Sequence, residues 1–294
     1  MSAEKPLLVI LGATGTQGGS VISHFLSLFP SPYTLRGITR NPTSPNSISL
    51  ASLGVEVVAG DFDDPASLDT AFKGASVIFS VTDFWKSYAN PSLHKLSGGK
   101  YSHVYHFDGK AIAEEYGKST YPELWEKTSV FYAGYYLENY FSPAGGLFRP
   151  RLDKEKDNLI LAVPEPLGTT PLPMYSAIDD TGTIVHALLR TSPGKKLIGV
   201  NEWLSFREFA RILAQVLGKH IEFVEIDFSF DLGDPEINKD HDEMGGFCVE
   251  FGYDGGKVDK GIIQPTSLGV PLQLHTVKEW CLKQDWKLVL DINK

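Results

Sequence analysis

Cysteine and long hydrophobic runs are both scarce in this sequence. Cys248 and Cys281 are its two cysteines. They are too few for a disulfide framework, and neither lies in a Cys-x-x-Cys pair or beside clustered histidines. No stretch approaches the roughly 18 apolar residues of a membrane-spanning helix, and the apolar run at residues 7–11 is too short for a signal-peptide core. We therefore expect a cytoplasmic protein with reduced thiols, no metal site and no membrane contact.

Positive charge is scarce as well. The chain has 27 Lys and Arg residues against 36 Asp and Glu residues, a net charge of −9, and no run of basic residues. Such a chain is a weak electrostatic partner for nucleic acid or an anionic membrane. Its hydrophobic content of 42% is typical of a globular protein. A length of 294 residues suffices for about two domains.

The first 81 residues alternate between strand and helix patterns. Short apolar runs predict strands at residues 7–11, 34–39, 55–59 and 75–81, with a helix before Pro30 and another at residues 65–73. Continuously apolar strands are typical of a parallel sheet that is buried on both faces and joined by right-handed crossovers. We therefore expect an α/β fold with a doubly wound parallel sheet.

The pattern changes beyond residue 81. Residues 86–105 are polar and aperiodic, followed by a predicted helix at 107–116 and a predicted strand at 129–132. Prolines divide the chain after residue 145. We expect helices at 181–189, 205–217 (capped by Ser205 and Gly218) and 276–284, a half-buried strand at 221–226, and an acidic irregular segment at 232–256. This half is typical of a smaller α+β lobe.

A glycine-rich loop follows the first predicted strand. Residues 12–18 read Gly-Ala-Thr-Gly-Thr-Gln-Gly and lead directly into an amphipathic helix pattern. In this context Gly12 permits the tight turn, Gly15 lets backbone N–H groups approach a diphosphate, and Gly18 lets the helix pack closely on the strand. The positive end of the helix favours the diphosphate. The loop predicts dinucleotide binding; a glycine-rich turn without a ligand is the alternative.

The ends of the second and third strands indicate which dinucleotide binds. An NAD site has Asp or Glu at the end of the second strand, whereas this chain has Arg40. A guanidinium can bind a 2′-phosphate that a carboxylate would repel, so we expect NADP(H). A solvated charge is the alternative. Asp61 and Phe62 suit the adenine, while Asp63 or Asp64 equally suits the cap of the next helix.

Several of these segments together resemble the NmrA-like family of atypical short-chain dehydrogenases/reductases, which are related to isoflavone reductases. The segments are residues 11–18 (LGATGTQG), 37–42 (GITRNP), 60–63 (GDFD), 81–85 (VTDFW) and 106–110 (HFDGK). Residues 136–139 (YLEN) resemble the family's substrate-side loop. The resemblance spans nearly the whole chain and is greatest to fungal oxidoreductases.

The resemblance implies a Rossmann-type fold, with residues 1–145 as an NADP-binding domain and residues 146–294 as a smaller α+β substrate lobe. It implies that Lys110 reaches the ribose hydroxyls, that residues 82–84 line the nicotinamide ribose, and that residues 136–139 close the nicotinamide end. The implied cofactor-binding residues are Gly12, Ala13, Thr14, Gly15, Thr16, Gln17, Gly18, Ile38, Thr39, Arg40, Asn41, Asp61, Phe62, Thr82, Asp83, Phe84, Lys110, Tyr136, Leu137, Glu138 and Asn139. Tyr135, Tyr136 and Tyr140, with Trp85, form either an aromatic substrate wall or part of the core.

The chain departs from the dehydrogenase pattern Tyr-x-x-x-Lys, in which the tyrosine donates the proton. His106 stands four residues before Lys110. His106 and Lys110 are therefore the catalytic candidates, since a histidine can donate a proton near neutral pH. A helix-entry histidine without catalysis is the alternative.

Two functions are compatible with this pattern. The first is an NADP(H)-dependent oxidoreductase that reduces a small natural product of secondary metabolism by hydride transfer. The second is an NADP-binding, redox-sensing transcriptional regulator without turnover, which would also act in the nucleus. A homodimer or a regulatory protein partner is open in either case.

The chain also departs from the family in length. Family members carry a longer stretch between the positions of Ser92 and Leu93, enough for one helix–strand unit. The apolar strand at 75–81 is typical of a central position, because an apolar edge strand promotes aggregation. We therefore expect residues 129–132 to pair with it in parallel, with 107–116 as the crossover helix and residues 86–108 as a long loop.

Overall fold

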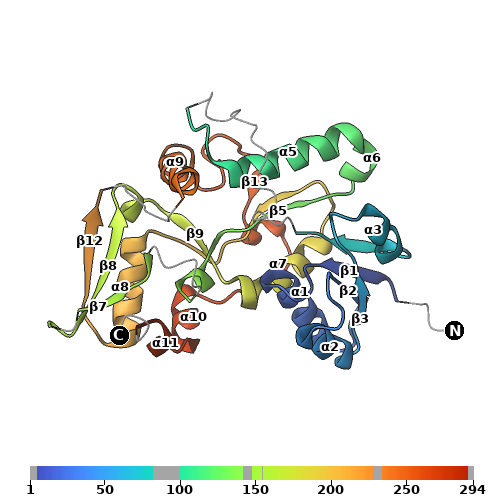
Figure 1. The fold of residues 1–294 in the computed structure, drawn as a ribbon, viewed down its shortest axis with the longest axis horizontal. Coiled ribbons are helices and arrows are strands. Elements are labelled where there is room, and N and C mark those ends of the chain that lie inside the picture. The colour runs from blue at the N-terminus through green and yellow to red at the C-terminus, as the bar shows by residue number, and fades with distance from the viewer. Residues whose placement is uncertain (1–4, 82–99, 142–147, 154, 228–233, 291–294) are drawn as a thin grey trace. The chain divides into compact units, whose positions relative to one another are not determined.

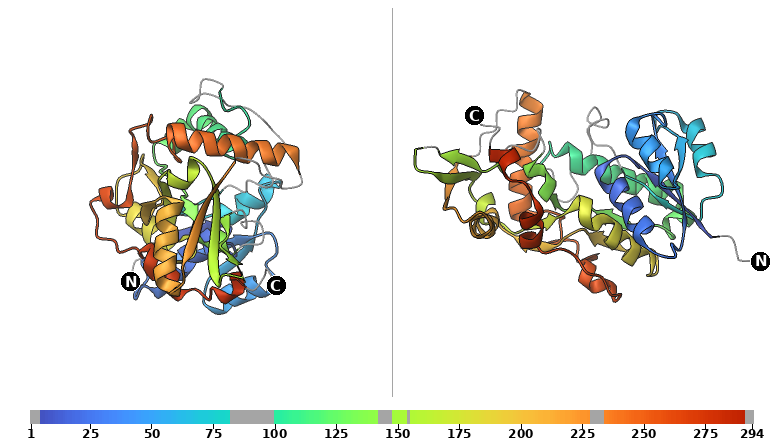
Figure 2. Two further views of the ribbon diagram at one scale, coloured as in Figure 1. Left: turned by 90° about the vertical axis from the view of Figure 1, so that its left-hand side faces the viewer. Right: turned by 90° about the horizontal axis from the view of Figure 1, so that it is seen from below.

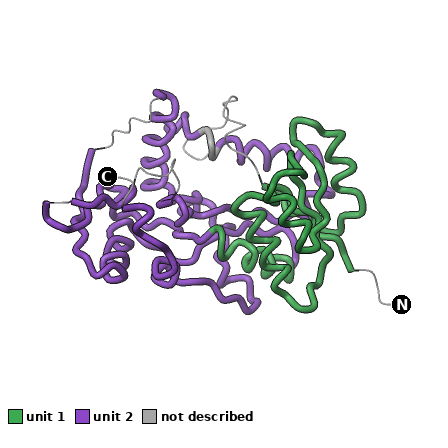
Figure 3. The backbone as a smooth tube through the Cα atoms, turned by 60° about the horizontal axis from the view of Figure 1, so that its bottom comes forward, with its two compact units in different colours: residues 1–82, 177–190 green, residues 83–176, 191–294 purple. Residues whose placement is uncertain are grey.

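The structure is a computed structural model that describes residues 5–81, 100–141, 148–153, 155–227 and 234–290, without the side chains of residues 105–107 (Figure 1). The chain divides into two compact units. Unit 1 comprises residues 1–82 and 177–190, and unit 2 comprises residues 83–176 and 191–294 (Figure 3). The sequence predicts an NADP-binding domain at residues 1–145 and a substrate lobe at residues 146–294. This division by function stays a prediction.

Unit 1 contains a four-stranded, wholly parallel sheet with the order β3-β2-β1-β4. Its strands are β1 (Leu7–Leu11), β2 (Thr34–Thr39), β3 (Glu56–Ala59) and β4 (Val77–Phe79). Its helices are α1 (Thr16–Ser27), α2 (Pro45–Ser52), α3 (Pro65–Phe72) and α7 (Ala177–Leu189). The expected α/β class and parallel sheet are confirmed.

Strand β1 is buried on both faces. Leu8 and Ile10 lie in a core with Val21, Ile22 and Phe25 of α1. On the opposite face, Val9 and Leu11 lie in a second core that includes Ala71 of α3. This alternation explains why the strand is apolar at every position, as the sequence pattern predicted.

Helix α7 joins unit 1 from a distant part of the chain. It packs against α1, and the backbone N–H of Gly182 donates to Ser20 Oγ at 3.1 Å. A Cβ atom at Gly182 would lie 2.3 Å from His24 Cβ. Helices α1 and α7 therefore approach each other more closely than any residue other than glycine at position 182 would permit.

Helix α2 lies in a stretch for which the sequence patterns predicted no helix. Ser44 accepts a hydrogen bond from the N–H of Ser47, and Pro45 occupies the first helical position. These are local start signals, but the helix has little apolar periodicity, because Ser47 is its buried residue.

The expected pairing of residues 129–132 with β4 is wrong. Strand β5 (Val130–Tyr132) pairs with β10 (Lys196–Ile198) in the parallel sheet β13-β10-β5. Among the described residues, β1 is the strand that pairs with β4. Ile78 in β4 is 46% exposed, so one face of this strand is open. Most of the expected loop at 86–108 lies outside the described residues, and its end is helical, because α5 (Tyr105–Thr120) begins there.

Unit 2 contains two further short sheets, with the orders β11-β9-β6 and β12-β8-β7. The remaining strands are β6 (Tyr135–Tyr136), β7 (Arg151–Asp153), β8 (Asn158–Pro164), β9 (Leu172–Tyr175), β11 (Glu202–Leu204), β12 (Ile221–Ile226) and β13 (Ile262–Ile263). The helices are α5, α6 (Pro122–Trp125), α8 (Phe206–Leu217), α9 (Pro235–Phe251), α10 (Val277–Lys283) and α11 (Lys287–Leu290), with 3-10 turns η1 (Leu137–Tyr140), η3 (Leu167–Thr169) and η4 (Pro265–Leu268). In the described part of the chain, no helix is both long and apolar enough to cross a bilayer.

Helix α8 packs on the β12-β8-β7 sheet (Figure 2). An aromatic core forms between them. Tyr140 stacks on Phe209 with ring centroids 4.4 Å apart, and Tyr135 meets Phe206 edge-on. Tyr140 is fully buried. For Tyr135 and Tyr140 the structure therefore favours the core interpretation over an aromatic substrate wall.

The sequence predicted that the acidic segment 232–256 is irregular. This prediction is wrong, because residues 235–251 form α9. Asp234 caps the helix by accepting from the N–H groups of Glu236 and Ile237, and Pro235 is its first residue. Phe247 and Cys248 are buried. The helix was missed because its buried residues are few and its remaining surface is charged.

Helix α8 begins with the predicted cap. Ser205 Oγ accepts from the N–H of Glu208, whose carboxylate accepts in turn from the N–H of Ser205, and Gly218 ends the helix at φ +61°. We expect Ser205→Ala to lower the free energy of unfolding by about 1 kcal/mol, since one helix N–H loses its acceptor. Urea unfolding would measure this. The control Ser49→Ala, at an exposed position within α2, should leave stability within about 0.5 kcal/mol.

Candidate dinucleotide and substrate sites

The loop between β1 and α1 has the geometry that its glycines predict. Gly12 has φ +63°, a conformation that other residues rarely adopt, and a Cβ there would lie 2.8 Å from Val81. A Cβ at Gly18 would lie 2.2 Å from the carbonyl oxygen of Gly12. The backbone N–H of Ala13 donates to the carbonyl of Ile38 at 3.3 Å, which ties the loop to the end of β2.

The N-terminus of α1 is open to a ligand. Gly15 is the N-cap residue, and among the described residues no side chain caps the helix. Thr14, Gly15 and Thr16 are exposed. The first N–H groups of a helix carry partial positive charge and need acceptors. The loop therefore fits a diphosphate at this position.

Arg36, within β2, and Arg40, directly after it, have different surroundings. Arg36 pairs with Glu56 at 2.8 Å and donates to the carbonyls of Ala71 and Lys73. Arg40 is exposed, and within the described residues it makes no ion pair. Arg36 thus joins β2 to β3 and α3, whereas the Arg40 guanidinium is available to an anionic ligand.

The neighbours of Arg40 shape the loop after β2. Asn41 Oδ1 accepts from the N–H and hydroxyl of Thr43, and the N–H of Asn41 donates to Thr39 Oγ1. The Ile38 side chain is buried, with 2% of its surface exposed. Ile38 can therefore offer only backbone atoms to a bound dinucleotide.

The end of β3 also has exposed groups beside it. Phe62 is 49% exposed, and Asp61 Oδ1 accepts from the N–H of Asp63 at 3.2 Å. Asp64 occupies the N-cap position of α3, but in this described stretch its side chain makes no capping hydrogen bond. An exposed aromatic ring beside a carboxylate is compatible with adenine binding at this position.

The predicted nicotinamide-side residues other than Thr82 belong to unit 2. Lys110 lies on α5 and keeps contact with solvent, yet burial lowers the pKa of its amine, while the nearby Asp240 carboxylate opposes this shift. His106 lies four residues earlier in the same helix, but its side chain is outside the described set, as are residues 82–84 and Trp85.

The segment 136–139 forms the end of β6 and most of η1. Leu137 is fully buried in the aromatic core. Glu138 accepts from the hydroxyl of Ser176 at 3.2 Å. Burial raises the pKa of Tyr136, with the Glu138 carboxylate adding to the shift. Tyr136, Glu138 and Asn139 retain partial exposure, whereas Leu137 does not.

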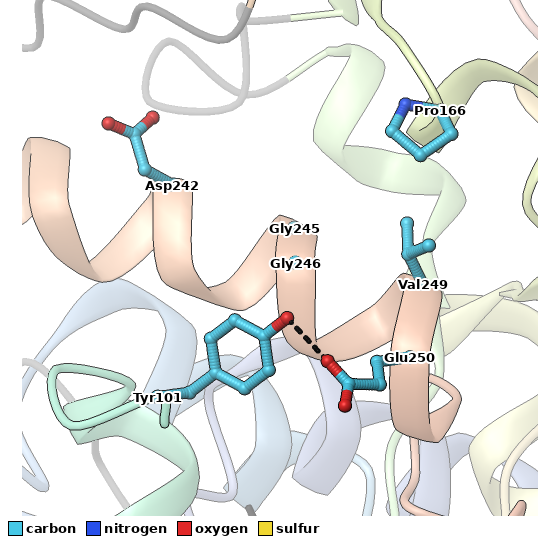
Figure 4. Close-up of a pocket in the computed structure, with 7 residues that line it drawn as sticks. All are labelled: Tyr101, Pro166, Asp242, Gly245, Gly246, Val249 and Glu250. Carbon is cyan, nitrogen blue, oxygen red and sulfur yellow. Dashed lines mark hydrogen bonds between the residues drawn. The ribbon is translucent and has the colours of Figure 1, made fainter. Parts of the chain in front are cut away.

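A cavity of about 430 Å³ lies along α9 in unit 2 (Figure 4). It is lined by Tyr101, Pro166, Asp242, Gly245, Gly246, Val249 and Glu250. The Tyr101 hydroxyl donates to Glu250 at 2.9 Å. Burial raises the pKa of Asp242, whereas hydrogen bonds from Lys100 and Tyr101 lower the pKa of Glu250.

A histidine–carboxylate pair that the sequence patterns did not predict lies beside this cavity. Glu243 binds both the ring and the backbone N–H of His103. Because 140 residues separate the two, no local pattern could reveal the pair. Elsewhere in the described residues, His, Cys, Asp and Glu side chains form no group of three or more that could hold a metal ion.

The sequence profile of the NmrA-like family matches residues 4–90 and 84–280 of this protein. The chain belongs to the NmrA-like family. This membership confirms the resemblance drawn from the glycine-rich loop and the strand-end motifs.

Similar proteins include fungal members of the NmrA-like family. The chain is 25% identical over 268 residues to the NmrA-like family domain-containing oxidoreductase malD of Malbranchea aurantiaca, covering 77% of each protein. It is 27% identical over 261 residues to the oxidoreductase ptmS of Penicillium ochrochloron, covering 76% of each.

Two solved structures share the fold. The crystal structure of NmrA, a negative transcriptional regulator in complex with NADP, aligns with a TM-score of 0.70 at 16% identity, covering 99% of this chain and 98% of NmrA. An isoflavone reductase aligns with a TM-score of 0.65 at 12% identity, covering 95% and 99%. Both likenesses confirm a Rossmann-type fold.

Because Gly15 is exposed in the glycine-rich loop, its substitution tests whether the loop binds a dinucleotide. We expect Gly15→Val to abolish dinucleotide binding, because the side chain would occupy the space of the diphosphate. The protein should stay folded, since φ at Gly15 is −92° and a Cβ there lies 3.2 Å from the nearest carbonyl oxygen, which a small shift relieves. Calorimetry with NADPH would measure binding. The control Gly19→Ala, whose Cβ would make an ordinary 3.7 Å contact, should bind as the wild type does; normal binding by Gly15→Val would make the loop a structural turn.

Proposed function

We propose that this NmrA-like protein is an NADP(H)-dependent oxidoreductase that reduces a small natural product of secondary metabolism. The observation that carries the proposal is the uncapped N-terminus of α1 behind the glycine-rich loop, which offers N–H donors to a diphosphate. The relatives malD and ptmS are named oxidoreductases, which supports redox chemistry. The NmrA structure bound to NADP supports a nicotinamide dinucleotide for this fold.

Arg40 supports the choice of NADP(H) over NAD(H). Its guanidinium is exposed at the end of β2, where a 2′-phosphate lies in a Rossmann-type site. A bidentate guanidinium–phosphate contact favours the phosphorylated cofactor, and a carboxylate at this place would instead favour the 2′-hydroxyl.

Lys110 is the proposed polar group at the reacting end. The cofactor, when bound, supplies the hydride. Lys110 would hold the ribose hydroxyls. Burial lowers the pKa of its amine, so it would exchange protons more readily than a lysine with the ordinary pKa. Tyr136, Glu138 and Asn139 would orient the substrate from η1 and its start.

The regulator without turnover is not favoured. Its support is a likeness to NmrA in fold alone, at 16% identity, whereas the curated relatives with higher identity are named oxidoreductases.

The position of Arg40 predicts a preference for NADPH. Wild-type protein should bind NADPH more tightly than NADH, and Arg40→Ala should weaken NADPH binding by roughly tenfold to 150-fold, equivalent to about 1.5–3 kcal/mol. NADH lacks the 2′-phosphate, so its affinity should not change and serves as the internal control. Calorimetric titration of both cofactors is the measurement, and equal wild-type affinities would contradict the assignment.

Turnover tests the proposed function itself. Purified protein with NADPH should lose absorbance at 340 nm with at least one member of a panel of enones and imines. Lys110→Met should lower kcat by about 100-fold or more, because the reacting end loses its proton-exchanging amine. The control is Lys118→Met on the same helix, where the amine pairs with Glu114. NADPH binding without turnover of any compound would favour the regulator.

A further inference from the structure

We infer that the His24–His186 pair makes the docking of α7 onto α1 sensitive to acid, so that protonation of both rings loosens α7 and weakens dinucleotide binding at the glycine-rich loop. Both histidines belong to unit 1. The part of the inference that concerns the dinucleotide rests on the proposed function, whereas the part that concerns α7 stands without it.

Two polar contacts, one helical turn apart, join the facing sides of α1 and α7. The backbone N–H of Gly182 donates to Ser20 Oγ at 3.1 Å, and His24 Nε2 lies 2.9 Å from His186 Nδ1. Ser20 and His24 are four residues apart, as are Gly182 and His186, so each pair lies on one face of its helix. Thr183 Oγ1 lies 3.3 Å from His24 Nδ1, the other nitrogen of that ring.

The two rings lie against an apolar core. The fully buried ring of Phe25 contacts both imidazoles, with centroid distances of 5.5 Å to His24 and 5.1 Å to His186. Burial lowers the pKa of His24, and the nearby His186 ring adds to this shift. Burial also lowers the pKa of His186, with the Arg190 guanidinium adding to the shift. The docked state therefore favours two neutral rings.

The ionisable groups around the pair do not favour positive charge there. Arg190 lies one turn beyond His186 on α7, and Tyr33 contacts the core from the chain just before β2. Asp179 and Asp180 lie in the first turn of α7, about 9–10 Å along the helix axis from His186. Within the described residues, neither ring forms an ion pair with a carboxylate. The strands under α1 contribute apolar side chains to this core, namely Leu8, Ile10 and Leu35.

Full disruption of the contact requires two protons. Two neutral rings share one hydrogen between His24 Nε2 and His186 Nδ1, and a first proton leaves this bond possible, because an imidazolium can donate to a neutral imidazole. A second proton places a hydrogen on both facing nitrogens, so the rings must separate. Released rings regain the ordinary histidine pKa of about 6.5. Docking is therefore strongest above about pH 6.5 and weakens as the pH falls toward the lower pKa values of the docked rings.

Loosening of α7 acts on the dinucleotide site through α1. Ser20 lies one turn after Thr16, the first residue of α1, and a Cβ at Gly182 would lie 2.5 Å from the carbonyl oxygen of Ser20. Helix α7 thus contacts α1 close to the N–H groups that face the glycine-rich loop. With 13 residues, α7 is too short to stay helical by itself once released. A ligand that binds the docked form more tightly stabilises it, and by reciprocity acid that releases α7 weakens the ligand.

Hydrogen exchange measured by mass spectrometry tests the docking of α7. Between pH 7 and pH 5.5, the protection factor of residues 177–190 in the full-length protein, corrected for the intrinsic pH dependence of exchange, should fall by about tenfold or more. Residues 206–217 of α8, in unit 2, should lose less than about threefold. An unchanged protection factor in α7, or an equal fall in α8 from global unfolding, would overturn the inference.

Variants test whether the histidine pair is the cause. The double variant His24→Gln, His186→Gln keeps hydrogen-bonding side chains without a titrating ring, and its protection in α7 should change by less than about threefold over the same range. His186→Gln alone keeps one titrating ring and should show roughly half the slope of the wild type on a logarithmic scale. The matched control His220→Gln removes an exposed histidine of unit 2 and should behave as the wild type does. A double variant with the slope of the wild type would overturn the inference.

Calorimetry with NADP⁺ tests the connection to the dinucleotide site. Between pH 7 and pH 5.5, the affinity should fall by at least about threefold more in the wild type than in the double variant. The 2′-phosphate itself takes up a proton near pH 6 with either protein, so the comparison isolates the histidine pair. Equal pH dependence would overturn the connection to dinucleotide binding. Absent NADP⁺ binding at pH 7 would overturn the proposed function and that connection together, whereas the exchange experiment, which needs no ligand, still decides whether acid loosens α7.

Discussion

The packing of unit 1 depends on how closely α1 approaches the glycine-rich loop and helix α7. At one end of the helix, the carbonyl of Gly12 occupies space that any side chain at Gly18 would need, and along its length Gly182 of α7 lies against Ser20 and His24. Close-packed interiors have no room to absorb such a side chain without moving the helix. Moving α1 would displace the same N–H groups that face the glycine-rich loop. Packing of the core and presentation of the candidate diphosphate site are therefore one geometric requirement.

Unit 2 is held together differently in its two halves. Around α8, large aromatic rings fill a buried core, where Tyr140 and Phe209 stack. Around α9, the segment before α5 is held by carboxylates: Glu243 binds His103, and Glu250 binds Lys100 and Tyr101. Charge-assisted hydrogen bonds of this kind set orientation more than they add stability, since part-exposed pairs contribute little net free energy. Around the cavity, charged groups thus orient the segment before α5, and the Tyr101 ring also packs edge-on against Phe247 and Phe251 of α9.

Local patterns predicted the parts of this protein that local forces determine. The apolar run of β1, the capping box at Ser205 and the glycine-rich loop were all visible because each is encoded within a few residues. Strand β5 was assigned the wrong partner, since a three-residue strand carries no information about pairing with β10, more than sixty residues later. Helix α9 and the His103–Glu243 pair were missed for the same reason: the contacts that make them recognisable come from a distant segment. Arg40 could be singled out by its place after β2, whereas the ion pair that engages Arg36 with Glu56 is visible only in the structure.

The membership of α7 in unit 1 has a consequence for biosynthesis. Residues 177–190 complete a unit whose other residues all precede residue 83. A ribosome adding about 5–20 residues per second needs roughly 5–20 seconds to make the intervening chain. During that time the face of α1 that binds Gly182 has no helix against it. The nascent chain therefore passes through a stage in which the glycine-rich loop is already synthesised but its supporting helix is not, and a truncated fragment ending near residue 82 would remain in that stage permanently.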